Sequence, residues 1–183
     1  MKFTLSWLKD HLETDASVDA IAEALTDLGL EVEGIEDPSK RLGDFTIGKV
    51  LHAEKHPDAD RLRICSVDLG EAGDEEPVQI VCGAPNVATG QKVPVATVGT
   101  ELMLPARDGS GLAPVTIKKG KIRGEVSFGM ICAEDELGLG DDHDGILVLE
   151  ADATAGQPFE AYLADRGNLP GDTVIDIAIT PNR

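Results

Sequence analysis

Two short stretches near opposite ends of the chain have the pattern of a half-buried β-strand, and neither has a partner strand nearby in the sequence. In LEVEGIE, residues 30–36, apolar residues alternate with glutamates until Asp37 and Pro38 stop the pattern. In TVIDIAIT, residues 173–180, three isoleucines share one face. We therefore predict that the two strands pair with each other, which closes a small domain from both ends of the chain and leaves residues 40–149 as an insert.

Two helices are expected ahead of the first of these strands. Ser6 can cap a short helix that ends near residue 12, and Ser17 can cap a second helix, which Gly29 ends. The second helix has one apolar face, formed by Ile21, Leu25 and Leu28.

The insert consists of short apolar stretches separated by glycine and proline. Strands are expected in FTIGKVLHAEK, LRICSVDLG, VQIVCG, KVPVATVG, TIKKGKIRG and FGMICA, and a short helix in EDELGLG. About five strands in roughly 100 residues, with one hairpin across the acidic loop EAGDEEP, favour an OB-type barrel. The predicted fold class is mainly β with an α+β flank. An OB-fold barrel, residues 40–149, is inserted into a small discontinuous helical and β domain, residues 1–39 and 150–183.

The net charge restricts which partners the chain can attract. The 183 residues include 16 basic and 34 acidic ones, a formal charge of −18, which repels a polyanion at long range. Residues 40–149 hold 12 basic and 18 acidic side chains, whereas the flanks hold 4 basic and 16 acidic ones. Four cations crowd into IKKGKIRG, residues 117–124, so we expect any anion-binding site there.

The termini and the cysteines indicate a soluble cytoplasmic protein. The N-terminal stretch MKFTLSWLKDHLETD meets charged residues too early for a signal peptide, and no apolar run is long enough to span a membrane. We therefore expect a cytoplasmic location and no membrane partner. Cys65, Cys82 and Cys132 lie far apart in apolar segments, which indicates buried, reduced thiols and neither disulfides nor a zinc site.

The stretch HPDAD offers the most suggestive metal pattern in the chain. His52 and His56 have the i, i+4 spacing of a helical metal pair, with Asp58 or Asp60 as further ligands. On a strand, however, residues four apart lie roughly 13 Å from each other. Pro57 favours an extended turn in which the two aspartates accept backbone N–H groups. The turn interpretation is therefore preferred.

Other catalytic patterns are weaker still. Cys82 could be paired with His56 as nucleophile and base, but Cys82 ends an apolar strand, where burial raises the pKa of a thiol. The stretch EDELGLGDDHDG lacks the ligand order of an EF-hand loop, and no phosphate-binding glycine motif follows a strand. We predict no catalytic residue, no metal ligand and no cofactor-binding residue in this chain.

Several stretches occur together in one order: GKVLHAEKHPDADRLRICSVDLG, VQIVCGAPNV, GQKVPVATVGTEL and KIRGEVSFGMICAEDELGLGDDHDGILVL. With SWLKDHL, LTDLGLEVEGIE and DIAITPNR at the ends, they resemble the N-terminal part of the bacterial phenylalanyl-tRNA synthetase β-subunit family over essentially the whole chain. The insert is similar to the tRNA-binding OB module of free-standing tRNA-binding proteins and of methionyl-tRNA synthetase tails. Glu125 departs from the family's usual order after Arg123 and Gly124, and Ala133 stands where a serine is common.

The resemblance implies a fragment of an enzyme that charges tRNA(Phe) with phenylalanine. The full enzyme would use ATP and Mg²⁺, and its α subunit would carry the aminoacylation site in an α2β2 heterotetramer. Residues for activation, metal binding and editing would lie outside this chain, which stops at TPNR. We therefore expect the fragment alone to be non-catalytic.

The chemistry of the insert favours recognition of the RNA backbone and shape. Only Phe45 and Phe128 could stack on bases in residues 40–149. Two alternatives stay open: the cations only solvate the strands, or the module serves assembly of the synthetase and has little tRNA affinity of its own. Scarce aromatics and acidic flanks favour assembly. The predicted phosphate contacts are Lys118, Lys119, Lys121 and Arg123, together with Lys49, Lys55, Arg61 and Arg63.

Overall fold

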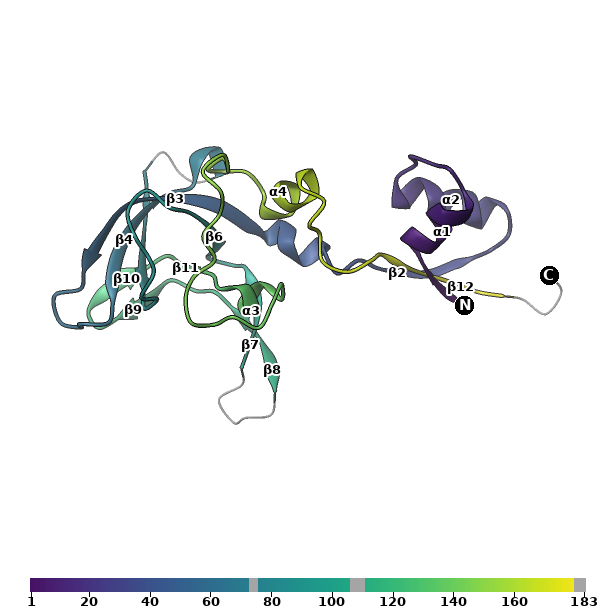
Figure 1. The fold of residues 1–183 in the computed structure, drawn as a ribbon. Coiled ribbons are helices and arrows are strands. Elements are labelled where there is room, and N and C mark those ends of the chain that lie inside the picture. The colour runs from purple at the N-terminus through teal and green to yellow at the C-terminus, as the bar shows by residue number, and fades with distance from the viewer. Residues whose placement is uncertain (73–75, 106–110, 180–183) are drawn as a thin grey trace. The chain divides into compact units, whose positions relative to one another are not determined.

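The chain forms two compact units, which are described separately (Figure 1). The first consists of Met1–Lys40 and Pro170–Arg183, and the second of Arg41–Leu169. The structure, a computed structural model, describes residues 1–72, 76–105 and 111–179. Part of the predicted acidic loop and the closing TPNR therefore lie outside the described residues.

The first unit is a three-stranded antiparallel sheet with two helices. Its elements are β1 (Lys2–Thr4), α1 (Leu5–His11), α2 (Val18–Asp27), β2 (Val32–Glu36) and β12 (Val174–Ile177). The strand order is β1-β12-β2, so the last strand of the chain lies between the first two. Ile177 lies opposite Val32, which confirms the predicted pairing of the two isolated strands. Ile21, Ile175 and Ile177 form the buried centre of this unit.

The capping of the first helix differs from the prediction. Thr4, and not Ser6, is the N-cap of α1, because its hydroxyl accepts the backbone N–H of Trp7 at 3.3 Å. Ser6 lies inside the helix, and its hydroxyl donates to the carboxylate of Asp172. The sequence did not reveal β1 because three residues are too short to show an alternating pattern.

The second helix largely follows the prediction. Ser17 caps α2 by accepting the backbone N–H of Ala20 at 3.2 Å, and Gly29 follows the helix with a positive φ of 82°. Ile21 is buried and Leu25 packs against the core. Leu28 was wrongly assigned to the same face, since it lies at the C-cap and its side chain is 70% exposed.

The second unit is built around a five-stranded antiparallel barrel. Its sheet has the order β11-β6-β3-β4-β5, and β10 and β11 close the barrel against β5. This arrangement confirms the predicted OB fold. The elements are η1 (Lys40–Asp44), which starts at the unit boundary, β3 (Phe45–Lys55), β4 (Arg63–Asp68), η2 (Gly70–Ala72), β5 (Val78–Cys82), β6 (Lys92–Thr97), β7 (Glu101–Pro105), β8 (Leu112–Thr116), β9 (Gly120–Ile122), β10 (Glu125–Ser127), β11 (Gly129–Ile131), α3 (Glu134–Leu137) and α4 (Phe159–Asp165).

The long strand β3 lets the barrel close because it pairs with β4 along one edge and with β6 along the other. Gly48 lies where β3 passes closest to its neighbours. A Cβ atom at this position would come within 2.6 Å of the Val67 side chain and 2.9 Å of the Val95 side chain. A glycine is therefore required for the barrel wall to pack this tightly.

Residues 150–169 lie in the second unit, so the predicted domain boundary at residue 149 falls inside that unit. The reason is that this segment is bonded and packed onto β3. The backbone N–H of Ile47 donates to Gln157, and the carbonyl of Ile47 accepts from Gly156. On α4, which was not predicted, Phe159 is fully buried in the same core cluster as Phe45. No helix in the described part of the chain is long and apolar enough to cross a membrane.

Candidate nucleic-acid interface

Three of the predicted cations meet at the turn between β3 and β4. Lys55 ends β3 and lies directly opposite Arg63, which begins β4, and Arg61 lies in the connecting turn. All three side chains are exposed. They line a hollow of about 510 Å³, which we call the cationic hollow; its other lining residues are Asp60, Leu62, Gly83, Ala84 and Pro85.

The HPDAD stretch forms the tight turn that positions these cations. The backbone N–H of His56 donates to the carbonyl of Leu62 at 3.0 Å, and its Nδ1 accepts the backbone N–H of Asp58 at 3.1 Å. The imidazole is only 2% exposed, and its Nε2 has no hydrogen-bond partner among the described residues. These contacts confirm the turn interpretation. Within the part of the chain that the structure describes, neither the Asp58 nor the Asp60 carboxylate accepts a backbone N–H group, contrary to the prediction.

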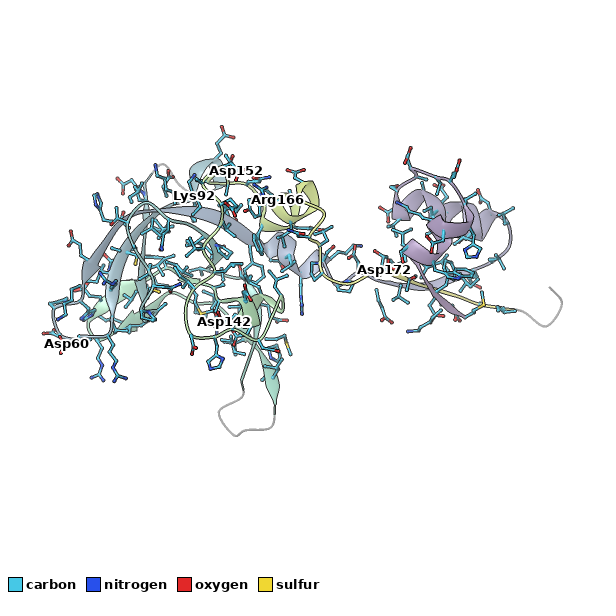
Figure 2. The ribbon with its side chains drawn as sticks, in the orientation of Figure 1. Asp60, Lys92, Asp142, Asp152, Arg166 and Asp172 are labelled. Carbon is cyan, nitrogen blue, oxygen red and sulfur yellow. The ribbon has the colours of Figure 1, made fainter. Side chains whose placement is uncertain are left out.

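Asp60 instead pairs with a cation of the hollow. Its carboxylate lies 2.7 Å from the ammonium of Lys55, and Figure 2 shows Asp60 in the turn at the end of the two strands. The hydrogen bond from Lys55, followed by its charge, lowers the pKa of Asp60. Both side chains are exposed, so a phosphate can compete with Asp60 for Lys55 at little cost.

The other group of predicted cations lies on and beside the β9–β10 hairpin. Lys118 and Lys119 precede β9, Lys121 lies on it, and Arg123 is in the turn that leads to β10. All four side chains are exposed, and together we call them the basic hairpin. Lys118 lines a second hollow of about 490 Å³, which shares Gly83, Ala84 and Pro85 with the cationic hollow. The two hollows therefore lie side by side.

The basic hairpin is held to the barrel by polar side chains that belong to no recognisable sequence motif. The Gln79 amide donates to the carbonyl of Val126 at 2.8 Å and to the carboxylate of Glu125 at 3.3 Å. The Ser127 hydroxyl accepts the backbone N–H of Val81 at 3.1 Å. Glu125, unusual in the sequence pattern, thus helps to anchor the hairpin. Sequence reasoning missed Gln79 and Ser127 because their partners are distant along the chain.

Arg123 has an unfavourable backbone conformation. Its φ of 50° is followed by a φ of 98° at Gly124, as in a two-residue hairpin turn of type I′. Arg123 is the one non-glycine residue with positive φ among the described residues. Asn or Gly would fit this position better, since a left-handed conformation costs other residues roughly 1–2 kcal/mol. This strained conformation makes Arg123 a candidate for a role outside folding.

Two of the predicted phosphate contacts, Lys49 and Lys119, differ from the others in their surroundings. Lys49 lies on β3, opposite Asp68 on β4 and Lys92 on β6, and it lines neither hollow. Lys119 makes a cation–π contact within the chain, because its ammonium lies 4.8 Å from the centroid of the Phe128 ring. Lys55, Arg61, Arg63 and Lys118 therefore border the two adjoining hollows. Lys119, Lys121 and Arg123 lie close to Lys118 along the chain but line neither hollow, and Lys49 lies separately on β3.

The described residues do not form a catalytic centre of the kinds considered from the sequence. All three cysteines are buried and unpaired, as predicted. Burial raises the pKa of Cys65 to about 12 and raises that of Cys82 as well, so neither is an activated nucleophile. In residues 1–72, 76–105 and 111–179 no group of three or more His, Cys, Asp or Glu side chains is placed to hold a metal. The geometry offers cations on a curved barrel surface, which is suited to binding an anion.

Comparison with known proteins identifies the class to which this barrel belongs. Residues 45–158 match the family described as "Putative tRNA binding domain", which covers the barrel and α3 and ends just before α4. The chain therefore belongs to the tRNA-binding domain family. A solved structure similar to this chain is the MetRS related protein from Pyrococcus horikoshii, with 22% identity and a TM-score of 0.40 over 61% of this chain and 84% of that one.

Relatives of the whole chain are more specific. It is 55% identical to the phenylalanine–tRNA ligase beta subunit of Ruegeria pomeroyi and 54% identical to that of Rhodospirillum rubrum, each over 183 residues. These alignments cover 100% of this chain and 21% of each relative. The resemblance drawn from the sequence motifs is thereby confirmed. The chain spans about a fifth of the length of the curated relatives it matches.

Proposed function

We propose that the chain is a non-catalytic tRNA-binding part of a phenylalanyl-tRNA synthetase β subunit. The observation that carries the proposal is that exposed cations border two adjoining hollows of one OB barrel: Lys55, Arg61 and Arg63 at the β3–β4 turn line one, and Lys118 of the basic hairpin lines the other. Phosphates along a folded RNA could contact both groups at once. The hollows supply the concave shape, and the cations supply the attraction.

The proposed mode of binding is recognition of the RNA backbone and its shape. Of the four aromatic side chains in the second unit, Phe45, Phe159 and Tyr162 are buried. Phe128 is exposed, but its ring already lies against Lys119. Stacking on bases therefore contributes little, and affinity depends on phosphate contacts, which are lost as salt rises.

The proposal assigns the remaining requirements of aminoacylation to parts of the synthetase outside this chain. ATP and Mg²⁺ would bind elsewhere, and no step of amino-acid activation involves the described residues. The proposal also includes an α subunit in an α2β2 assembly, tRNA(Phe) as the specific tRNA and a cytoplasmic location. These three points rest on the sequence identity with phenylalanine–tRNA ligase beta subunits.

A second candidate function is assembly of the synthetase. The first unit favours it, because residues 1–40 and 170–183 hold 4 basic and 12 acidic side chains and would repel RNA. Under this alternative the barrel packs against other parts of the enzyme and has little affinity for tRNA on its own. The two functions predict different results in the same binding experiment.

We expect fluorescently labelled tRNA to bind the chain with an affinity that falls as salt rises. The double variant Arg61→Ala, Arg63→Ala should bind about 10-fold more weakly at low salt and have a slope of log K against log[salt] shallower by about 1.5, since two phosphate contacts are removed. The matched control is Lys9→Ala, Lys40→Ala, which removes two exposed cations of the first unit. Equal weakening by both pairs, or no binding by the unmodified chain, would refute a local site and favour assembly.

Replacing Asp60 with asparagine should have the opposite effect. The change frees Lys55 from its ion pair and removes a negative charge from the cationic hollow, so tRNA affinity should rise, by up to about fivefold, the limit for an exposed pair. The same titration measures it, and Asp58→Asn, an exposed neighbour that does not line the hollow, is the control. A loss of affinity in Asp60→Asn would mean that the pair positions Lys55 and does not compete with phosphate.

A further inference from the structure

The β7–β8 hairpin carries apolar side chains that the barrel does not cover. Leu102 points inward and is buried in the core. Met103, opposite Pro114 in the strand register, is 42% exposed, and Leu112 is 64% exposed. Figure 1 shows this hairpin standing out from the barrel beside α3. Exposed apolar side chains grouped on a projecting hairpin are typical of a protein-binding surface.

These side chains form one wall of a groove of about 540 Å³, which we call the hairpin–helix groove. The wall consists of Met103, Leu104 and Leu112. The opposite wall is formed by α3 and the turn after it, where Leu139 adds a further apolar surface. Gly138 and Gly140 line the groove between the walls, with the Arg41 guanidinium beside Gly138 and the Glu134 carboxylate beside Gly140. An apolar side chain of a partner would therefore meet apolar atoms on both sides.

The rim of the groove is negatively charged. Asp135 and Asp141 line it, and residues 134–144 contain six acidic side chains and no lysine or arginine. Glu136 also lines the groove, and its carboxylate accepts the backbone N–H of Ala133 at 2.7 Å. One carboxylate oxygen of Asp135 accepts the backbone N–H of Glu136 at 2.8 Å, which leaves its other oxygen for a partner. A cation, Arg41, also lies at this turn, where its guanidinium donates to the carbonyl of Gly138 at 3.4 Å. Among the described residues, the carboxylates that line the groove outnumber this arginine.

We infer that the hairpin–helix groove binds a short protein segment in which an apolar side chain of leucine or methionine size is flanked by lysine or arginine. The apolar walls select the anchor, and the carboxylates of Asp135 and Asp141 select the flanking cations. RNA does not fit, because its phosphates would face the acidic rim. A second copy of this chain is disfavoured by a net charge of −18 on each copy.

The groove is distinct from the proposed tRNA surface. It shares no lining residue with the cationic hollow and shares only Glu136 with the hollow beside the basic hairpin. A protein segment and a tRNA can therefore be bound by the same barrel. The inference does not depend on the proposed tRNA binding, and each can fail without the other.

The test uses NMR of the ¹⁵N-labelled chain titrated with three ten-residue peptides: alternating leucine and lysine, alternating serine and lysine, and alternating leucine and glutamate. The leucine–lysine peptide should shift the amide signals of residues 101–104, 112–113, 115–116 and 134–141 in a saturable way. The serine–lysine peptide should bind at least tenfold more weakly, and the leucine–glutamate peptide should not bind. Equal binding of both lysine peptides would show attraction by charge alone and would overturn the inference, as would the absence of saturable shifts.

Variants locate the site. Met103→Ser with Leu112→Ser should weaken binding of the leucine–lysine peptide at least tenfold, and Asp135→Asn with Asp141→Asn should weaken it several-fold and flatten its salt dependence. Val148→Ser, an exposed apolar residue outside the groove, should bind as the unmodified chain does. Unchanged peptide binding by the Met103 and Leu112 variant would overturn the inference. The same variant should retain its affinity for tRNA, which separates this result from a test of the proposed function.

Discussion

Replacing Lys118, Lys119, Lys121 and Arg123 together with alanine should lower the affinity for tRNA about 100-fold at low salt and make the slope of log K against log[salt] shallower by about 3. This is the largest effect expected on the proposed surface, because four exposed cations lie close together on and beside one short hairpin. Each phosphate contact that is lost also removes the release of a counterion. Anisotropy of labelled tRNA at several salt concentrations measures both the affinity and the slope.

The fold should survive this substitution, so that a loss of binding can be attributed to charge. The contacts that anchor the hairpin come from Gln79 and Ser127, which are unchanged. Lys49→Ala is the control, since this exposed cation of the barrel lies on β3, outside both the basic hairpin and the two hollows. If the fourfold variant and the unmodified chain bind tRNA equally, the basic hairpin only solvates the barrel and assembly becomes the better account of the module.

Arg123 allows a finer test of the same surface. Arg123→Asn removes one cation and places a residue that tolerates positive φ in the turn, so thermal stability should rise slightly, by roughly 0.5–1 kcal/mol, while tRNA affinity falls. A structural role for Arg123 would lower both quantities together. Opposite changes in stability and affinity are the signature of a residue retained for binding.

Local patterns in the sequence predicted most of the barrel. The stretch FTIGKVLHAEK forms β3 with the predicted bounds, and EDELGLG contains the short helix α3. The pairing of β12 with β2 could also be predicted, because each strand had a clear apolar face and no nearby partner. These elements could be predicted because the signal for each lies within a few consecutive residues. The signal is either an alternation of apolar and polar side chains or a capping residue such as Ser17.

The parts that could not be predicted depend on contacts between distant residues. The segment Gly83–Pro85 joins the two hollows, but nothing in its own sequence shows which cations surround it. The predicted set of eight cations contained the two groups, and only the folded barrel shows that Lys49 is apart from them. The helix α4 was missed because its apolar side chains are matched to β3, more than 100 residues earlier in the chain.

The proposed tRNA surface and the hairpin–helix groove lie at different places on the barrel, so tRNA binding and assembly need not be alternatives. Cations border the hollows at Gly83–Pro85, whereas apolar and acidic side chains line the hairpin–helix groove. A negative net charge is compatible with tRNA binding when the acidic residues are concentrated elsewhere, because salt screens charges beyond roughly 10 Å. Binding of tRNA and attachment to a protein partner can therefore be properties of one barrel and need not exclude each other.

The largest expected effect on stability is that of Phe159→Ala in α4. Phe159 is fully buried among Leu42, Phe45 and Ile47, so its removal leaves a cavity in the barrel core and should cost about 3–5 kcal/mol of the free energy of unfolding. Urea denaturation followed by far-UV circular dichroism measures this. Tryptophan fluorescence would not, because the single tryptophan, Trp7, lies in the first unit.

Phe128→Ala is the matched control, since it makes the same change at a phenylalanine that is 37% exposed on the same barrel and should cost about 1 kcal/mol or less. A comparable cost for the two substitutions would mean that α4 is not part of the barrel core, and would return the domain boundary to residue 149. A large difference would mean that residues 150–169 are needed to complete the barrel. Any shorter version of the module made for tRNA titrations would then have to extend to the end of α4.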